Sequence, residues 1–203
     1  FRNQERHQGL NVIVGLGNPG RTYHETRHNI GFRVIQRLAE RRHVELRERI
    51  VSEVDGRPAA VYGEYRRGGR HVRLLMPLTM MNESGEALRT VEVPTQEILI
   101  VCDDVNLPLG TIRLRPQGSA GGHHGLQSCL EALGTQRVPR LRIGVGSEGL
   151  PGNLIDFVLS PFQSAERPLV KHAIEQAGEA CEMWIMEGME MAMNRCNRPQ
   201  VVG

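Results

Sequence analysis

Three clusters of this 203-residue chain carry side chains whose chemistry suits hydrolysis. They are residues 15–29, with Asn18 and His28; residues 102–104, with Asp103; and the glycine-rich residues 121–125, with His123 and His124. A histidine can take a proton from water, a carboxylate can orient that histidine, and side-chain amides can donate hydrogen bonds to a developing negative charge. The residue types therefore predict a hydrolytic site that needs no serine or cysteine nucleophile.

His28 and Asp103 are the pair from which we expect the proton transfer. Asp103 directly follows an apolar run at residues 98–102, and an acid beside a buried strand is costly unless it has a partner or a task. A carboxylate that holds Nδ1 of an imidazole leaves Nε2 free to act as a base. On residue types alone, a purely structural role for His28 near the start of a helix stays open.

Residues 15–20 also match the glycine pattern of dinucleotide-binding proteins. Two features argue against that use: Pro19 precedes the third glycine, and about ten residues separate Gly20 from the next predicted helix, whereas a dinucleotide site begins its helix within the glycines. We expect instead a tight turn that directs Asn18 into a crevice. The alternative is that Asn18 is only a turn residue.

The elements that must position these residues alternate between strands and helices. Short β-branched or alternating runs predict strands at residues 11–16, 59–65, 72–76, 98–102, 111–114 and 141–145, the second and third forming a hairpin. Apolar residues at helical spacing predict helices around residues 32–39, 83–91, 126–133 and 164–187. The predicted fold is a single globular α/β domain with a mixed, twisted β-sheet surrounded by helices.

Composition excludes several classes of protein. The chain is 39% hydrophobic and 24% charged, typical of one globular core, and its strongest apolar stretch, near residues 98–102, is too short to span a membrane. The four cysteines form no C-x-x-C pair, which argues against a zinc ribbon or a disulfide scaffold and favours a reducing compartment. We expect tails at residues 1–10 and 196–203 around a catalytic domain at residues 11–195.

The small net charge of +2 is unevenly distributed. Residues 1–142 carry a net charge of +6, all of the basic residues being arginine, and residues 143–203 carry −4. An arginine-rich first part suits a phosphate-bearing partner because the guanidinium matches phosphate geometry. The alternative is that the arginines reflect composition alone and lie on solvated surfaces.

Six motifs together carry a family resemblance. They are, in chain order, VGLGNPG at residues 14–20, TRHN at 26–29, MNESG at 81–85, LPLG at 107–110, GSAGGHHGL at 118–126 and RLRIGVG at 140–146. In content and order they resemble the bacterial-type peptidyl-tRNA hydrolase family, over roughly residues 11–195. The resemblance implies hydrolysis of the ester between a peptide and the 3′ ribose of tRNA, by a monomer without metal or cofactor.

The same resemblance implies roles for single residues. His28 would be the general base and Asp103 its orienting carboxylate. Asn18 and Asn82 would hold the peptide and the attacking water, and Tyr23 and Met81 would line the crevice near the terminal nucleotide. Arg115 and Arg142 would bind a tRNA phosphate. The partner is thus peptidyl-tRNA, the expected location is the cytoplasm, and an organelle matrix is the alternative if a targeting segment was removed.

One departure from the family pattern falls in the site. His124 stands where the family has an asparagine that binds substrate, and an imidazole cannot offer the two protons of an amide. We expect His124 to retain a substrate-binding role, and we expect His123 to pack within its loop. Asp104 and Asn106 also differ from the family and look peripheral.

Two other functions stay open on the sequence. One is an RNA-binding protein on the same fold, with reduced or lost hydrolysis, for which the substituted His124 is the only hint at the site. The other is the dinucleotide enzyme. We expect no metal site, because the pair His24 and His28 precedes the predicted helix and lacks the H-E-x-x-H pattern.

Overall fold

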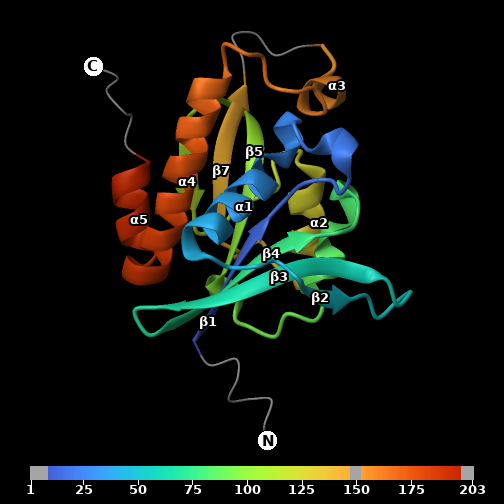
Figure 1. Cartoon of the computed structure of the whole chain (residues 1–203), viewed down its shortest axis with the longest axis vertical. Helices are drawn as coiled ribbons and strands as arrows, with labels where there is room; N and C mark the ends of the chain where they lie inside the picture. The colour runs from blue at the N-terminus through green and yellow to red at the C-terminus, as the bar shows by residue number, and fades with distance from the viewer. Residues whose placement is uncertain (1–8, 147–151, 198–203) are drawn as a thin grey trace, which may run out of the picture.

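A seven-stranded mixed sheet forms the centre of the molecule (Figure 1). The structure is a computed structural model that describes residues 9–146 and 152–197. The strands are β1 (Leu10–Gly15), β2 (Glu48–Val51), β3 (Pro58–Arg67), β4 (Arg70–Pro77), β5 (Ile98–Pro108), β6 (Ile112–Arg115) and β7 (Arg140–Gly146), in the spatial order β2-β3-β4-β1-β5-β7-β6. β1 pairs in parallel with β4 and β5, and β5 pairs in parallel with β7, whereas the other pairs are antiparallel.

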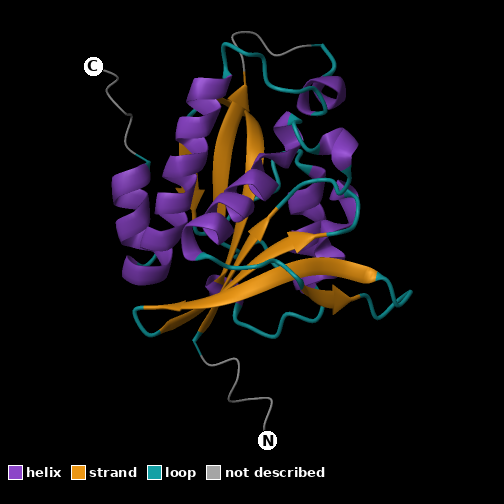
Figure 2. Ribbon diagram, in the orientation of Figure 1, coloured by secondary structure: helices purple, strands orange, loops and turns teal. Residues whose placement is uncertain are grey.

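Helices cover both faces of this sheet (Figure 2). The α-helices are α1 (Ile30–Arg42), α2 (His124–Leu133), α3 (Leu154–Val158), α4 (Arg167–Glu187) and α5 (Met189–Cys196), and the 3₁₀ turns are η1 (Arg21–Tyr23), η2 (Arg27–Asn29), η3 (Met81–Leu88) and η4 (Thr95–Glu97). α1, α4 and α5 share one hydrophobic cluster with the sheet, and α2 and η3 share the other. The predicted α/β class with a mixed sheet is confirmed.

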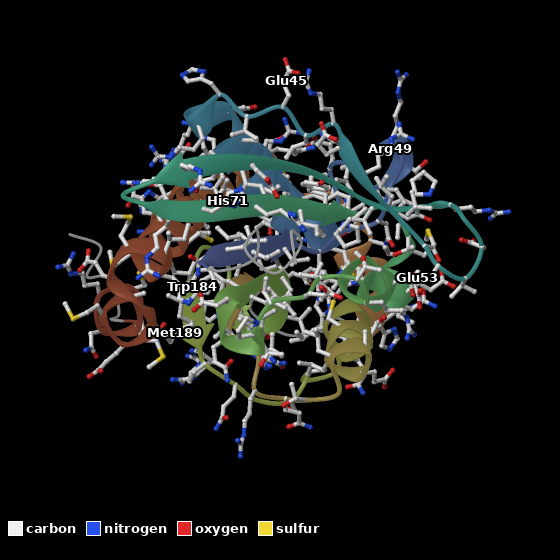
Figure 3. All side chains as sticks on the ribbon, turned by 90° about the horizontal axis from the view of Figure 1, so that it is seen from below. Glu45, Arg49, Glu53, His71, Trp184 and Met189 are labelled. Carbon is white, nitrogen blue, oxygen red and sulfur yellow. The ribbon has the colours of Figure 1, made fainter. Side chains whose placement is uncertain are left out.

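The central strands are apolar on both sides because both of their faces are covered. All six residues of β1 are buried; Ile13 belongs to the cluster under α1, whereas Val12 and Val14 belong to the cluster under α2. Trp184 of α4 is also buried, and it lies toward the interior in the view from below, where Glu45 points away from the molecule (Figure 3). Among the described residues, no helix has both the length and the hydropathy needed to cross a membrane.

Two glycines allow the start of α1 to lie directly on the carboxyl end of β1. A Cβ at Gly15 would lie 2.3 Å from the carbonyl oxygen of Gly31, and a Cβ at Gly31 would lie 2.5 Å from the backbone of Leu16 and of Val101. Only glycine fits such an approach of one backbone to another. This contact brings η2, which directly precedes α1, against β5.

Strand β5 is longer than the sequence predicts. The apolar run ends at Cys102, but pairing with β7 continues through Asp103, which lies opposite Ile143, and the strand ends at Pro108. Asp103 therefore lies inside the strand and not after it. β2 and α3 were not predicted either, because both are short and largely exposed.

The end of α5 contacts the edge strand β6. The side chain of Asn197 accepts a hydrogen bond from the backbone N–H of Leu114 at 2.8 Å and donates one to the carbonyl oxygen of the same residue at 3.0 Å. One side-chain amide thus satisfies both backbone groups of Leu114 that point away from β7.

Candidate active site

A cleft of about 570 Å³ lies beyond the carboxyl ends of β1 and β4 and beside the second half of β5, close to the usual ligand position in an open α/β sheet. It is lined by residues from segments far apart in the sequence, among them Asn18, His28, Met81, Asn82, Asp103, His123, His124 and Arg142. Several candidates that lie up to 124 positions apart in the sequence, from Asn18 to Arg142, are thus brought together in one cleft.

His28 and Asp103 are hydrogen-bonded at the floor of this cleft. Nδ1 of His28 lies 2.8 Å from Oδ1 of Asp103, whose side chain is 3% exposed, while the His28 side chain is 13% exposed. An ionised carboxylate can only accept a hydrogen bond, so Nδ1 of His28 carries the proton. Nε2 of His28 therefore holds the lone pair that a general base needs.

His123 is a second donor to the same carboxylate oxygen. Nε2 of His123 lies 3.0 Å from Oδ1 of Asp103, and Nδ1 of His123 accepts the backbone N–H of Leu126 at 3.1 Å, which caps α2. Because Nδ1 accepts, Nε2 must carry the proton and donate. The expectation that His123 only packs in its loop is therefore wrong: its ring fixes the start of α2 and also holds Asp103.

The two histidines keep Asp103 ionised. Burial alone raises the pKa of a carboxyl, but the electrostatic attraction of His123 and His28 and the hydrogen bonds that their N–H groups donate outweigh burial and hold the pKa of Asp103 well below its usual range. The two imidazole rings are adjacent, with centroids 4.8 Å apart. Asp103 is thus an acceptor at every pH at which the protein is expected to work, and it fixes the tautomer of His28.

Asn18 is oriented by two neighbours. The Asn29 side chain makes two hydrogen bonds to the Asn18 backbone, accepting from its N–H at 2.9 Å and donating to its carbonyl oxygen at 2.8 Å. Oδ1 of Asn18 accepts the backbone N–H of Met81 at 2.7 Å. Since that donor requires an oxygen, the Nδ2 group of Asn18 is left as the donor toward the cleft. Asn29, a buried amide beside His28, was missed by the sequence reasoning although its place in a helix-start motif marks it.

One wall of the cleft is apolar and comes from α3 and the residues after it. Leu154, Ile155, Val158 and Leu159 line the cleft there, and Ile155 is 62% exposed. Another part of the lining is polar and includes Asn82 at the start of η3 and His124, the first residue of α2, both of them exposed. The cleft can therefore receive a ligand with an apolar part and a polar part.

His28, Asp103 and His123 also have the composition of a metal site, with donor atoms within 4.8 Å of one another. Their hydrogen bonds argue against that use. Both histidines present N–H groups to Asp103, and the second nitrogen of His123 accepts the N–H of Leu126, so His123 has no lone pair left for a metal. The arrangement fits proton transfer better than metal binding.

Comparison with known proteins identifies the family. The sequence model of the peptidyl-tRNA hydrolase family matches residues 12–202. The chain belongs to the peptidyl-tRNA hydrolase family. It is 43% identical over 192 residues to a peptidyl-tRNA hydrolase of Syntrophomonas wolfei and 41% identical to one of Bacillus cereus, in both cases over 93% of this chain and the whole of the relative.

Solved peptidyl-tRNA hydrolases share the fold as well. The crystal structure from Acinetobacter baumannii superposes with a TM-score of 0.83 at 32% identity, over 94% of this chain and 96% of that one. The structure of a peptidyl-tRNA hydrolase in complex with N-propanol gives the same TM-score over 96% and 98%. The predicted family is thus confirmed by both sequence and structure.

Two residues that the family resemblance assigns to the site lie outside the cleft lining. Tyr23 is half-buried on η1. Arg115 is exposed at the end of β6, where its backbone lies opposite that of Arg140 in β7. Arg142 does line the cleft, but its guanidinium bonds Asp104 at 3.0 Å and the carbonyl oxygen of Ser119 at 2.9 Å. Their roles toward the nucleotide and the phosphate stay predictions.

His124 offers a test of the departure from the family motif in the glycine-rich loop. We expect the His124→Asn variant to stay active and to bind substrate more tightly, because an amide offers two N–H protons to a ligand where one tautomer of an imidazole offers a single N–H. The measurement is KM and kcat of both proteins on N-acyl-aminoacyl-tRNA. A KM that is unchanged in the variant would contradict a substrate-binding role for His124.

Proposed function

We propose that this chain hydrolyses the ester bond between a peptide and the 3′ ribose of tRNA, and so recycles tRNA from peptidyl-tRNA. The observation that carries the proposal is the pair His28 and Asp103, with Nε2 of His28 free in the cleft of a chain that belongs to the peptidyl-tRNA hydrolase family. The relatives named above bear that activity in their names.

The proposed reaction needs only the groups present. Nε2 of His28 takes a proton from a water molecule, and the water oxygen attacks the ester carbonyl carbon. The negative charge that develops on the carbonyl oxygen is stabilised by amide donors, for which Nδ2 of Asn18 and the side chain of Asn82 are the candidates. Collapse of the intermediate breaks the bond to the ribose oxygen, which receives the proton from His28. The products are a peptide carboxylic acid and tRNA with a free hydroxyl group.

Asp103 has a supporting role in this scheme. Its ionised carboxylate holds the Nδ1 proton of His28 and stabilises the imidazolium that forms when Nε2 takes a proton. His123 supports Asp103 in turn. We further propose that Tyr23 and Met81 contact the terminal nucleotide, that Arg115 and Arg142 contact phosphate, and that the enzyme acts as a cytoplasmic monomer without metal or cofactor.

The deciding experiment is release of an N-acylated amino acid from N-acyl-aminoacyl-tRNA by the purified chain, with and without EDTA. We expect turnover that EDTA leaves unchanged, because the groups of the site act without a metal. Tight tRNA binding without turnover would favour the RNA-binding alternative and would point to His124 as the cause. Turnover lost with EDTA and restored by a divalent metal would overturn the metal-free mechanism.

A further inference from the structure

Arg27, the residue before His28, is almost completely buried, with 3% of its surface exposed. A buried arginine is rare unless it is paired, because removing a guanidinium from water is costly. The proposed reaction does not use Arg27. The burial of its guanidinium therefore needs another explanation.

The Arg27 guanidinium contacts two aromatic rings that lie more than 100 positions later in the sequence. It stacks on Phe157 of α3, with Cζ 4.4 Å from the ring centroid, and on Phe162, at 4.8 Å. Nη2 of Arg27 donates to Oε2 of Glu166 at 2.7 Å. Cation–π contacts are strongest where water is excluded, so this double stack is a firm attachment.

The backbone around Arg27 is attached to the same segment. The N–H of Arg27 donates to the carbonyl oxygen of Ser160 at 3.0 Å, and Thr26 forms a β-bridge with Pro161. We call residues 153–162 the α3 segment. The same segment also carries apolar residues that line the cleft, among them Leu154 and Ile155.

Arg27 and His28 belong to the same turn, η2, which spans only Arg27–Asn29. The position of the His28 ring therefore depends on the position of Arg27, and Arg27 is held by the α3 segment. We propose that Arg27 is a positioning residue that couples the apolar wall of the cleft to the general base. The proposal rests on the proposed function of His28.

Glu166 supports the stack without contacting the cleft. Burial alone would raise its pKa, but the hydrogen bond from Arg27 and that from the backbone of Gln163 lower the pKa of Glu166 below its usual value. Glu166 therefore stays ionised beside Arg27, and it anchors the guanidinium at the point where α4 begins.

The test compares Arg27→Lys and Phe157→Leu with a matched control, Glu175→Gln. Glu175 pairs with Arg37 and Arg41 and so joins α4 to α1 by ion pairs, much as Glu166 joins α4 to η2. Glu175, Arg37 and Arg41 do not line the cleft. All variants are assayed well below their melting temperatures, so that a loss of stability alone leaves kcat unchanged.

We expect Arg27→Lys and Phe157→Leu each to lower kcat by roughly 10- to 100-fold, as small misplacements of a catalytic group do, with Glu175→Gln near the parent. The double variant should lose little more than either single variant, because both break one coupling. Lysine keeps the charge but not the flat stacking surface, so charge alone should not restore the rate.

A second readout does not depend on turnover. The Nδ1 proton of His28, held by Asp103, should give a low-field NMR signal, and we expect that signal to shift or broaden in Arg27→Lys and Phe157→Leu but not in Glu175→Gln. Variants that lose stability while keeping the parent kcat and the parent signal would overturn the coupling. If the parent protein has no hydrolase activity, the proposed function fails, and an altered NMR signal would still support the attachment of His28 to the α3 segment.

Discussion

Replacing His28 by alanine is expected to lower kcat by about 10²–10⁴-fold, the usual contribution of a general base. The imidazole of His28 has a nitrogen, Nε2, that can take a proton from water, and its Nδ1 is held by Asp103 at 2.8 Å. The measurement is the single-turnover rate on N-acyl-aminoacyl-tRNA at saturating enzyme, which separates the chemical step from product release.

His24 provides the control for this variant. It lies four residues earlier on the same loop, its side chain is 60% exposed, and it pairs with Glu25, which is also exposed. We expect His24→Ala to keep the parent rate. Added imidazole should restore part of the activity of His28→Ala by occupying the space of the lost ring. A His28→Ala protein that turns over like the parent would remove His28 from the mechanism.

The second large effect is expected for Asp103→Asn, with a fall in kcat on the order of 10³–10⁴-fold, as when an orienting carboxylate is replaced in a catalytic triad. An amide has one acceptor and two donor protons, so it no longer provides a charged acceptor for the N–H groups of both His28 and His123. The His28 tautomer with its proton on Nε2 becomes favourable, and that tautomer cannot act as a base. Asp104→Asn, which instead releases Arg142, should affect KM more than kcat.

The lowered pKa of Asp103 predicts how the free energy of unfolding depends on pH. Its pKa is lower in the folded protein than in the unfolded chain, where a carboxyl titrates near pH 3.9, so the ionised group stabilises the fold above that pH. This contribution should be complete above about pH 5 and should decline as the pH falls through 4 and below. Urea unfolding of the parent and of Asp103→Asn at pH 7, 5 and 3.5 should show a difference in unfolding free energy that shrinks with acidification. A difference that is constant with pH would contradict an ionised Asp103.

The parts of the site that could be predicted are those marked by local sequence. An acid directly after an apolar run suggested a buried partner for a histidine, and His28 at 2.8 Å from Asp103 is that partner. The glycine-rich turn before Asn18 likewise indicated a crevice at the end of a strand. These signals are local because turns and buried strands have their own residue preferences.

The parts that could not be predicted depend on contacts between distant segments. His123 looks like any loop histidine until the loop folds and brings Nε2 within 3.0 Å of Asp103. Arg27 looks like a surface arginine, and its partner Glu166 lies 139 positions later in the chain. The predicted end of β5 was wrong for a similar reason. Pairing with β7 extends the strand beyond its apolar run, and the residues of β5 alone do not indicate that β7 lies beside it.

The contact between Asn197 and Leu114 affects whether two molecules can associate through the edge strand β6. β6 is the last strand of the sheet on its side, and an outer strand with unpaired N–H and C=O groups is a template on which a strand of another molecule can grow. At Leu114 both groups are already occupied by one side chain. A strand from a second molecule would have to displace Asn197 before it could pair there, so this amide protects the sheet from aggregation through its β6 side.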